Sequence, residues 1–346
     1  MLLIHRSDAC LMQSHLQLSQ QSFQDVLHAL LPIDRQAEDI RAAYQHALGA
    51  QRKRFDDIHA VDWNALVQHY LISSRRPLLS ATVSGSAHPL ILLADAYDLA
   101  NANVAVEALA MLAIDYNPLH KLLDASVQSN PVKSSVLDTL ARIRTDERFD
   151  GLFDTPGVRN TSIVLKSKPA ATAVLEYLNA LTIRTPAEAL NELAIAAALL
   201  LCATDDVEPS GKREFDMYLT HQLTFVWSAR VLVLALPPTA TKLLLRAAWL
   251  MMILTSITQL RPVIVPTRLT RSSLADKEAA AEWTRLTAVA LNSTTGLDDP
   301  HYTKVIQTLR EFAMLWPEDE GLFLGACVLF EREWVGWKGF DAVTEH

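Results

Sequence analysis

Four of the eleven histidines fall within, or at the start of, strongly apolar segments with helical spacing. These four are His28, His88, His221 and His301. Helical proteins commonly build metal or cofactor sites from side chains that several helices project into a shared interior. Neutral imidazole is the commonest transition-metal ligand, and nitrogen-rich sites suit iron, copper or zinc. The spacing therefore favours a shared histidine site, although each imidazole taken alone also fits a hydrogen-bonded core position.

Lys304 follows His301 by three residues and so shares its helical face. A lysine beside a buried histidine normally extends its ammonium group to water. If Lys304 is buried, we expect it to have a shifted pKa, to pair with Asp298 or Asp299, or to be modified. A carboxylated lysine would supply oxygen ligands to a metal.

Other local signals of chemistry are absent from the sequence. It contains no GxGxxG, GxxxxGK[ST], GxSxG or HExxH motif, and its three cysteines, Cys10, Cys202 and Cys327, form no CxxC pair. No motif for a flavin or a nucleotide is therefore present, and a disulfide scaffold is not expected. The cysteine usage and the lack of a signal-peptide pattern favour a cytoplasmic protein.

The elements that must position these residues are predicted to be helices. The chain has 346 residues, of which 50% are apolar, 20% are charged and only 10 are glycine, which favours an all-α fold. We expect one large helical domain over residues 1–346. Its helices could form two lobes around a central cavity. The predicted helices include Trp63–Ile72, Val104–Ile114, Ala187–Ala203, Phe215–Leu236, Thr241–Leu260, Glu278–Leu291, Pro300–Leu315 and Glu318–Trp334. Val158–Lys166 is the best strand candidate.

Charge and hydropathy exclude two classes of partner. The formal net charge of −8 argues against binding nucleic acid through a broad basic surface. The most apolar stretch, Ala247–Leu260, has only 14 residues between two arginines, whereas a membrane span needs about 20. We therefore predict a core helix there and no membrane association.

The segments around the histidines resemble the questin oxidase-like family. Ser86–Ala94 (SAHPLILLA) is similar to the family's HPLIHLGYA, and Glu107–Ala110 follows at the expected distance. Phe215–Thr224 (FDMYLTHQLT) is similar to FDFFLMHxVT, and Asp298–Lys304 (DDPHYTK) to DEHVxK. Leu244–Arg246 with Trp249 and Arg261-Pro262 resembles LLRxYW…RGRP, and the region before His28 resembles NHLxH. The resemblance covers residues 23 to 312 in order.

This resemblance implies an α-helical oxygenase that opens polyketide quinone rings by Baeyer–Villiger-type oxidation, with NADPH as the electron donor. Two positions depart from the family pattern. The second histidine of HPLIHLGYA is Leu92 here, and the first histidine of NHLxH falls on Asp25. Asp25 could replace an imidazole as an oxygen ligand, whereas Leu92 could not.

The hypothesis is therefore an oxygenase of secondary metabolism with a non-haem iron site. His28, His88, His221 and His301 would hold the metal, completed by Asp25 or Lys304. His221 and His301 are the candidate catalytic residues, and without metal they would act as acid and base. Tyr218, Phe225, Trp227 and Trp249 would line the site for a flat aromatic or polyketide-like substrate, although plain core packing explains each of them equally well.

Two other classes of function stay open. The first is a small-molecule-binding member of the family that has lost or altered its chemistry, as the leucine at position 92 suggests. The second is a helical-repeat scaffold for protein partners, which would have a long curved shape and a large exposed apolar patch.

Overall fold

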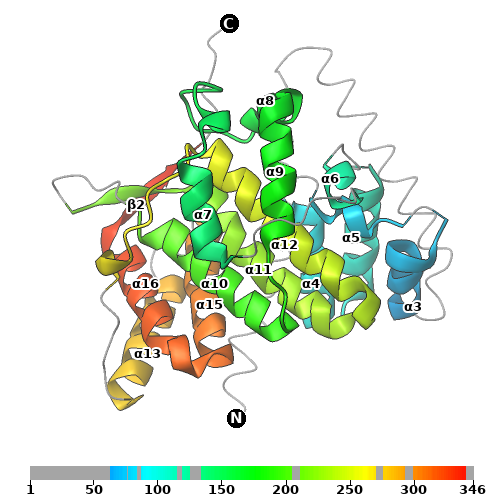
Figure 1. Ribbon diagram of the computed structural model, residues 1–346. Helices are drawn as coiled ribbons and strands as arrows, with labels where there is room; N and C mark the ends of the chain where they lie inside the picture. Colours follow the sequence, from blue (N-terminus) through cyan, green and yellow to red (C-terminus); the bar gives the residue numbers. More distant parts are fainter. Residues whose placement is uncertain are drawn as a thin grey trace, which may run out of the picture.

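The computed structural model describes residues 63–75, 77–83, 87–114, 119–124, 134–204, 211–269, 276–292 and 299–339. Helices dominate this part of the chain, which confirms the all-α prediction (Figure 1). The α-helices are α3 (Trp63–Gln68), α4 (His88–Asp98), α5 (Ala102–Ile114), α6 (His120–Asp124), α7 (Val136–Arg144), α8 (Asn160–Lys166), α9 (Lys168–Ala180), α10 (Pro186–Cys202), α11 (Met217–Ala235), α12 (Pro238–Thr258), α13 (Asp276–Asn292), α15 (Pro300–Leu315) and α16 (Glu320–Glu333).

Short elements join these helices. A π-helix, His69–Ser73, extends α3, and 3₁₀ turns occupy Leu79–Val83, Glu147–Phe149, Pro266–Arg268 and Pro317–Asp319. Two strands, β1 (Arg213–Asp216) and β2 (Trp334–Lys338), pair in parallel, with Phe215 opposite Trp337 and Asp216 opposite Lys338. The pairing brings the end of the described chain beside the start of α11.

Helix α11 lies at the centre of the molecule and packs against α4, α10, α12 and α15 (Figure 1). Its buried apolar side chains belong to one hydrophobic cluster that runs through the described residues from Leu66 to Phe330. Asp216 begins the helix, because its carboxylate accepts hydrogen bonds from the backbone N–H groups of Tyr218 and Leu219. The predicted helix from Phe215 therefore starts two residues later, after a strand.

Helix α12 contains the apolar stretch that the sequence assigned to the core. By length and composition it could also cross a membrane, but 78% of its most apolar 18-residue window is buried inside the structure. Trp249, on this helix, is fully buried and donates its indole hydrogen to the carbonyl of Tyr177 at 2.9 Å. The packing is that of a core helix.

The strand prediction for Val158–Lys166 is wrong, since residues 160–166 form α8. Its apolar residues divide between the two sides of a helix, with Val164 buried and Ile163 exposed. The side chain of Asn160 anchors the first turn by donating to the carbonyls of Thr155 and Thr258. No strand lies beside this segment among the described residues, so its β-branched residues have no sheet to join.

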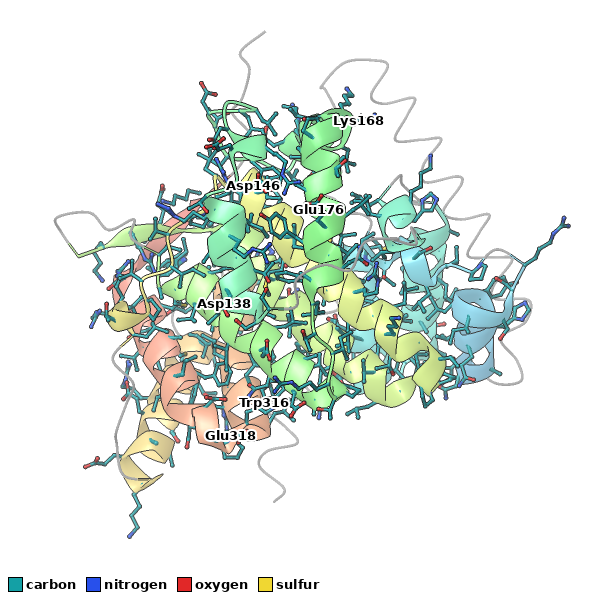
Figure 2. The ribbon with its side chains drawn as sticks, viewed as in Figure 1. Asp138, Asp146, Lys168, Glu176, Trp316 and Glu318 are labelled. Carbon is teal, nitrogen blue, oxygen red and sulfur yellow. The ribbon has the colours of Figure 1, made fainter. Side chains whose placement is uncertain are left out.

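An ionic cluster joins the turn after α7 to α9. Arg148 contacts Asp146 at 2.6 Å and Glu176 at 2.7 Å, and the hydroxyl of Tyr177 donates to Asp146 at 2.8 Å. Figure 2 shows Asp146 and Glu176 close together on these neighbouring elements. Although burial opposes ionisation of Asp146, its hydrogen bonds with Arg148 and Tyr177 prevail and lower its pKa to about 2. Asp146 therefore stays ionised, and its contacts with Arg148 and Tyr177 join the turn after α7 to α9.

Candidate functional site

Three of the four predicted histidines meet in the structure. The ring centroids of His88 and His221 are 5.0 Å apart, and those of His221 and His301 are 5.3 Å apart. The three rings come from α4, α11 and α15, and each lies within the first two turns of its helix. His28 lies outside the described residues, as does Asp25. We call His88, His221 and His301 the histidine cluster.

Local backbone features place two of these imidazoles at helix starts. Ala87, just before His88, has a left-handed backbone with φ of 71°, and Pro89 occupies the first turn of α4. Asp299 accepts hydrogen bonds from the N–H groups of His301 and Tyr302 at 2.9 and 3.0 Å, so it caps α15. His301 is thus held by a cap and by the proline that precedes it.

The environment keeps the imidazoles of His221 and His301 neutral. Burial lowers the pKa of His221 to about 3, with a smaller contribution from His88. Burial also lowers the pKa of His301 well below its usual value, helped by His221. The Nδ1 atom of His221 lies 2.8 Å from the carbonyl oxygen of Met217. Because a carbonyl only accepts, Nδ1 carries the hydrogen and Nε2 keeps a lone pair.

Lys304 lies one turn beyond His301 and faces an acid that the sequence analysis did not select. Burial lowers the pKa of Lys304, and the charge of Asp95 on α4 opposes that change. Burial raises the pKa of Asp95, and Lys304 opposes it in turn. Of the two acids expected to pair with Lys304, Asp299 caps α15 and Asp298 lies outside the described residues. Among the described residues, Asp95 is therefore the acid whose charge acts on Lys304, and its position on a separate helix gave no local signal.

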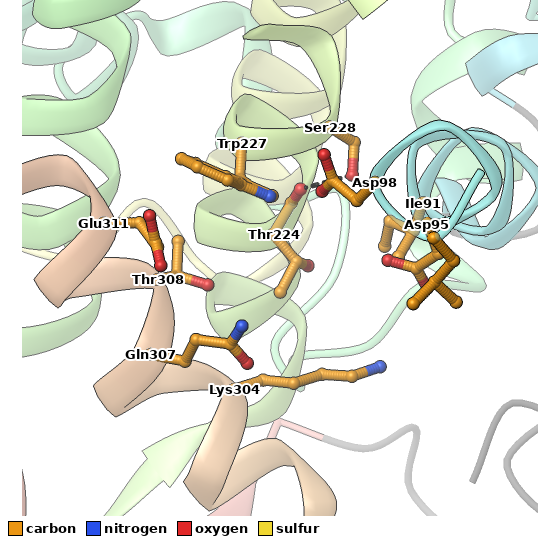
Figure 3. Close-up of a pocket in the computed structure, with 11 residues that line it drawn as sticks. Ile91, Asp95, Asp98, Thr224, Trp227, Ser228, Lys304, Gln307, Thr308 and Glu311 are labelled. Atoms are coloured by element: carbon orange, nitrogen blue, oxygen red, sulfur yellow. Dashed lines mark hydrogen bonds between the residues drawn. The ribbon is translucent and has the colours of Figure 1, made fainter. Parts of the chain in front are cut away.

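A pocket of about 90 Å³ opens beside Lys304, between α4, α11 and α15 (Figure 3). Asp95, Asp98 and Glu311 contribute carboxyl groups, and Trp227 forms part of its wall. Its volume is well below the roughly 300–1,000 Å³ of sites for drug-sized ligands. As it stands, this space suits water or a small molecule rather than a fused-ring substrate.

The four predicted substrate-binding aromatics do not gather in one place. Tyr218 has its ring centroid 6.3 Å from that of His221, and Trp227 lines the small pocket. Phe225 and Trp249 are fully buried and line neither this pocket nor the one described next.

A larger pocket of about 450 Å³ lies where β1 and the loop after β2 meet the ends of α10 and α12. Asp216 lines it, and burial raises the pKa of this carboxyl to about 7, against the hydrogen bonds from Leu219 and Tyr218. The polar residues in its wall also include Arg213, which is itself buried against Glu333 at 3.3 Å. This pocket therefore has a polar wall in which Arg213 and Asp216 already have partners within the protein.

Trp337 is a neighbour of the cluster that sequence reasoning missed. Its ring centroid lies 6.2 Å from that of His301, and its indole hydrogen is donated to Asp299. The predicted last helix ended at Trp334, and the short run Trp334–Lys338 gave no strong strand signal. Its two tryptophans and one valine, residue types that are enriched in strands, were the one feature that could have indicated a strand.

The chemistry available to the cluster is that of imidazole nitrogen donors, of which those of His221 and His301 are kept neutral by burial. Within the described ranges, no group of three or more His, Cys, Asp or Glu side chains is arranged to hold a metal ion. The three imidazoles adjoin one another, and the remaining predicted ligands are Lys304 and the two residues outside those ranges. The arrangement can also bind a neutral hydrogen-bonding group.

Comparison with models of protein families gives a match over most of the chain. The model of a family described as questin oxidase-like matches residues 27–309, which is most of the chain and includes the histidine cluster and Lys304. No curated protein matches the chain.

Proposed function

Because the chain belongs to the questin oxidase-like family, which implies an oxidoreductase and indicates an oxygenase of secondary metabolism, we propose a specific reaction for it. The reaction is Baeyer–Villiger-type oxidation or oxidative C–C cleavage of an aromatic, quinone-like substrate at the histidine cluster. One observation carries the proposal: three imidazoles from distant parts of the chain adjoin one another between α4, α11 and α15.

The low pKa values favour ligand chemistry over acid–base chemistry. A general acid or base works best when its pKa is near the operating pH. With a pKa of about 3, the imidazolium form of His221 is scarce at neutral pH, and its neutral form is a weak base. A neutral imidazole with a free Nε2 lone pair is, by contrast, the form that binds metal.

The donor set fits non-haem iron in its chemistry. His88, His221 and His301 would hold the metal, together with His28 and with Lys304 or Asp25. Bound iron would supply the activation of dioxygen that this reaction needs. In the proposal, NADPH supplies the electrons and the protein works in the cytoplasm.

The chain's own residues would orient the ligands and control protons. The carbonyl of Met217 fixes the ring of His221 through Nδ1, and the cap at Asp299 fixes the backbone of His301. Lys304 and Asp95 both line the small pocket, and the charge of each opposes the effect of burial on the pKa of the other, so either group could hold a proton there.

Elemental analysis tests the metal site. Protein purified without chelators and reconstituted anaerobically with ferrous iron is expected to hold close to one iron per chain. His221→Gln should lose that iron while the far-UV circular dichroism stays unchanged. His120→Gln, which alters a histidine outside the cluster, is the matched control and should keep it. Equal iron in both variants, or none in the unaltered protein, would contradict the iron site.

Turnover tests the reaction separately. Dioxygen uptake with a hydroxyanthraquinone and NADPH, followed by mass spectrometry of the product, should show one or two oxygen atoms from ¹⁸O₂ in the product. Product without the label would contradict an oxygenase.

A second candidate is a member of the family that binds the substrate class without turning it over. Leu92 favours it, because this side chain lies one turn beyond His88 on α4, where the family motif has a histidine. Tight binding of the hydroxyanthraquinone without dioxygen uptake would select this candidate over the oxygenase.

A further inference from the structure

The helices that carry His221 and His301 start in the same way. Asp216 caps α11 by accepting from the N–H groups of Tyr218 and Leu219 at 2.8 and 2.9 Å. Asp299 caps α15 by accepting from the N–H groups of His301 and Tyr302. In each case one carboxylate oxygen takes both backbone hydrogens, which leaves the other oxygen for a second contact.

The second oxygen of each capping carboxylate is connected to residues at the end of β2, either directly or through Gln259. The indole of Trp337 donates to the Oδ2 atom of Asp299. On the other cap, the amide nitrogen of Gln259, oriented to satisfy its neighbours, donates to Oδ2 of Asp216 at 2.7 Å and to the carbonyl of Gly339 at 3.2 Å. Only Lys338 separates Trp337 from Gly339, so one short segment contacts both caps.

The backbone supports the same connection. Strand β2 pairs with β1 so that Phe215 faces Trp337 and Asp216 faces Lys338. Gly339 has φ of +90°, and a Cβ at this position would overlap the carboxylate of Asp216. The close approach therefore requires glycine, and it fixes the distance between the strand and the cap of α11.

The ring of Trp337 also packs against the site itself. Its centroid is 6.2 Å from that of His301 at an interplanar angle of 76°, an edge-to-face arrangement. Trp337 thus contacts the imidazole and the cap of the same helix. This residue lies beyond residue 309, where the family match ends.

We infer that Trp337 is a positioning residue: its hydrogen bond to Asp299 and its ring contact hold the imidazole of His301 in register with that of His221. The inference rests on the proposed function only in assuming that the cluster is the reaction centre. Reacting groups misplaced by about 1 Å can lose a factor of about one hundred in rate. The segment Trp337–Gly339 then sets the separation of the two rings through the two caps.

Trp337→Phe tests the inference, because it keeps an aromatic ring and removes the hydrogen donated to Asp299. Trp334→Phe is the matched control on the same strand, since the indole nitrogen of Trp334 has no hydrogen-bond partner among the described residues. The readout is the imidazole region of ¹H–¹⁵N spectra of the full chain, with the His301 signals assigned from a His301→Gln variant.

We expect Trp337→Phe to shift the His301 signals and Trp334→Phe to leave them in place. Where the protein turns over, kcat should fall about ten- to a hundredfold in Trp337→Phe and change less than about twofold in Trp334→Phe. His301 signals that stay in place in Trp337→Phe would overturn the inference. Should that variant fail to fold, Asp299→Asn keeps an oxygen for the cap but not a second acceptor for the indole, and it should shift the same signals.

The spectra separate this inference from the proposed function. If the unaltered protein shows neither bound iron nor dioxygen uptake, the proposed function fails, while the His301 signals still decide the role of Trp337.

Discussion

Replacing His221 with glutamine should change how the stability of the protein depends on pH. The folded protein holds this imidazole at a pKa of about 3, whereas the unfolded chain has the ordinary value of 6.5. Between these values the unfolded chain binds a proton that the folded protein does not, so the free energy of unfolding falls as pH falls. At about pH 5.5 the unfolded histidine is roughly ten-to-one protonated, which costs the folded state about 1.4 kcal/mol.

His221→Gln removes this titration. Groups that do not interact with His221 titrate in the same way in both proteins, so their contributions cancel in the difference between variant and unaltered protein. Urea unfolding of the metal-free proteins, followed by far-UV circular dichroism, gives the free energy at each pH. Between about pH 7.5 and 5.5, the unaltered protein should lose about 1.4 kcal/mol more than the variant. A difference that stays constant within about 0.3 kcal/mol would refute the conclusion that burial keeps His221 neutral.

Three further predictions concern other groups. Asp216 has a raised pKa of about 7, so the stability that its protonated form contributes is lost as pH rises from 3.8 through 7. In the same urea assay, the free energy of unfolding of the unaltered protein should therefore fall by about 2 kcal/mol more than that of Asp216→Asn between about pH 5.5 and 7.5. Arg213→Met leaves the buried Glu333 without one partner and should lower the free energy of unfolding by about 3 kcal/mol. Its control Arg285→Met, in a more exposed pair, should cost about 0–1 kcal/mol. Trp249→Phe removes the buried hydrogen bond to the carbonyl of Tyr177, so it should lower the free energy of unfolding by about 1–3 kcal/mol without changing KM. A raised KM would instead indicate that Trp249 contacts the substrate.

Much of the fold follows from the sequence because helix signals are local. The proline-led helix at Pro300–Leu315 has the bounds predicted for it, and α10 differs from its prediction by one residue at each end. The prediction failed where a partner distant in sequence decides the structure. The residues of β1 form a strand only because β2 lies beside them, more than a hundred residues later.

In the candidate site, too, residues with a local sequence signal were predicted, and residues whose role depends on a distant partner were missed. Each histidine was found from its own apolar surroundings, and the structure brings three of the four together. Asp95 and Trp337 were missed because their roles depend on Lys304 and Asp299, which neighbouring elements bring close. The residue pattern of a single segment does not indicate which other helix, strand or helix cap that segment will contact.

The three imidazoles belong to helices that start at residues 88, 217 and 300, and this spacing has a consequence for the order of events during synthesis. Domains are made from the N-terminus at roughly 5–20 residues per second, so α4 and α11 leave the ribosome well before α15 and β2. The chain must also close two long loops before the rings can meet, which delays these contacts relative to local helix formation. Any ion or substrate that needs all three rings can therefore bind only after synthesis has passed α15 and the newly made chain has folded around α11.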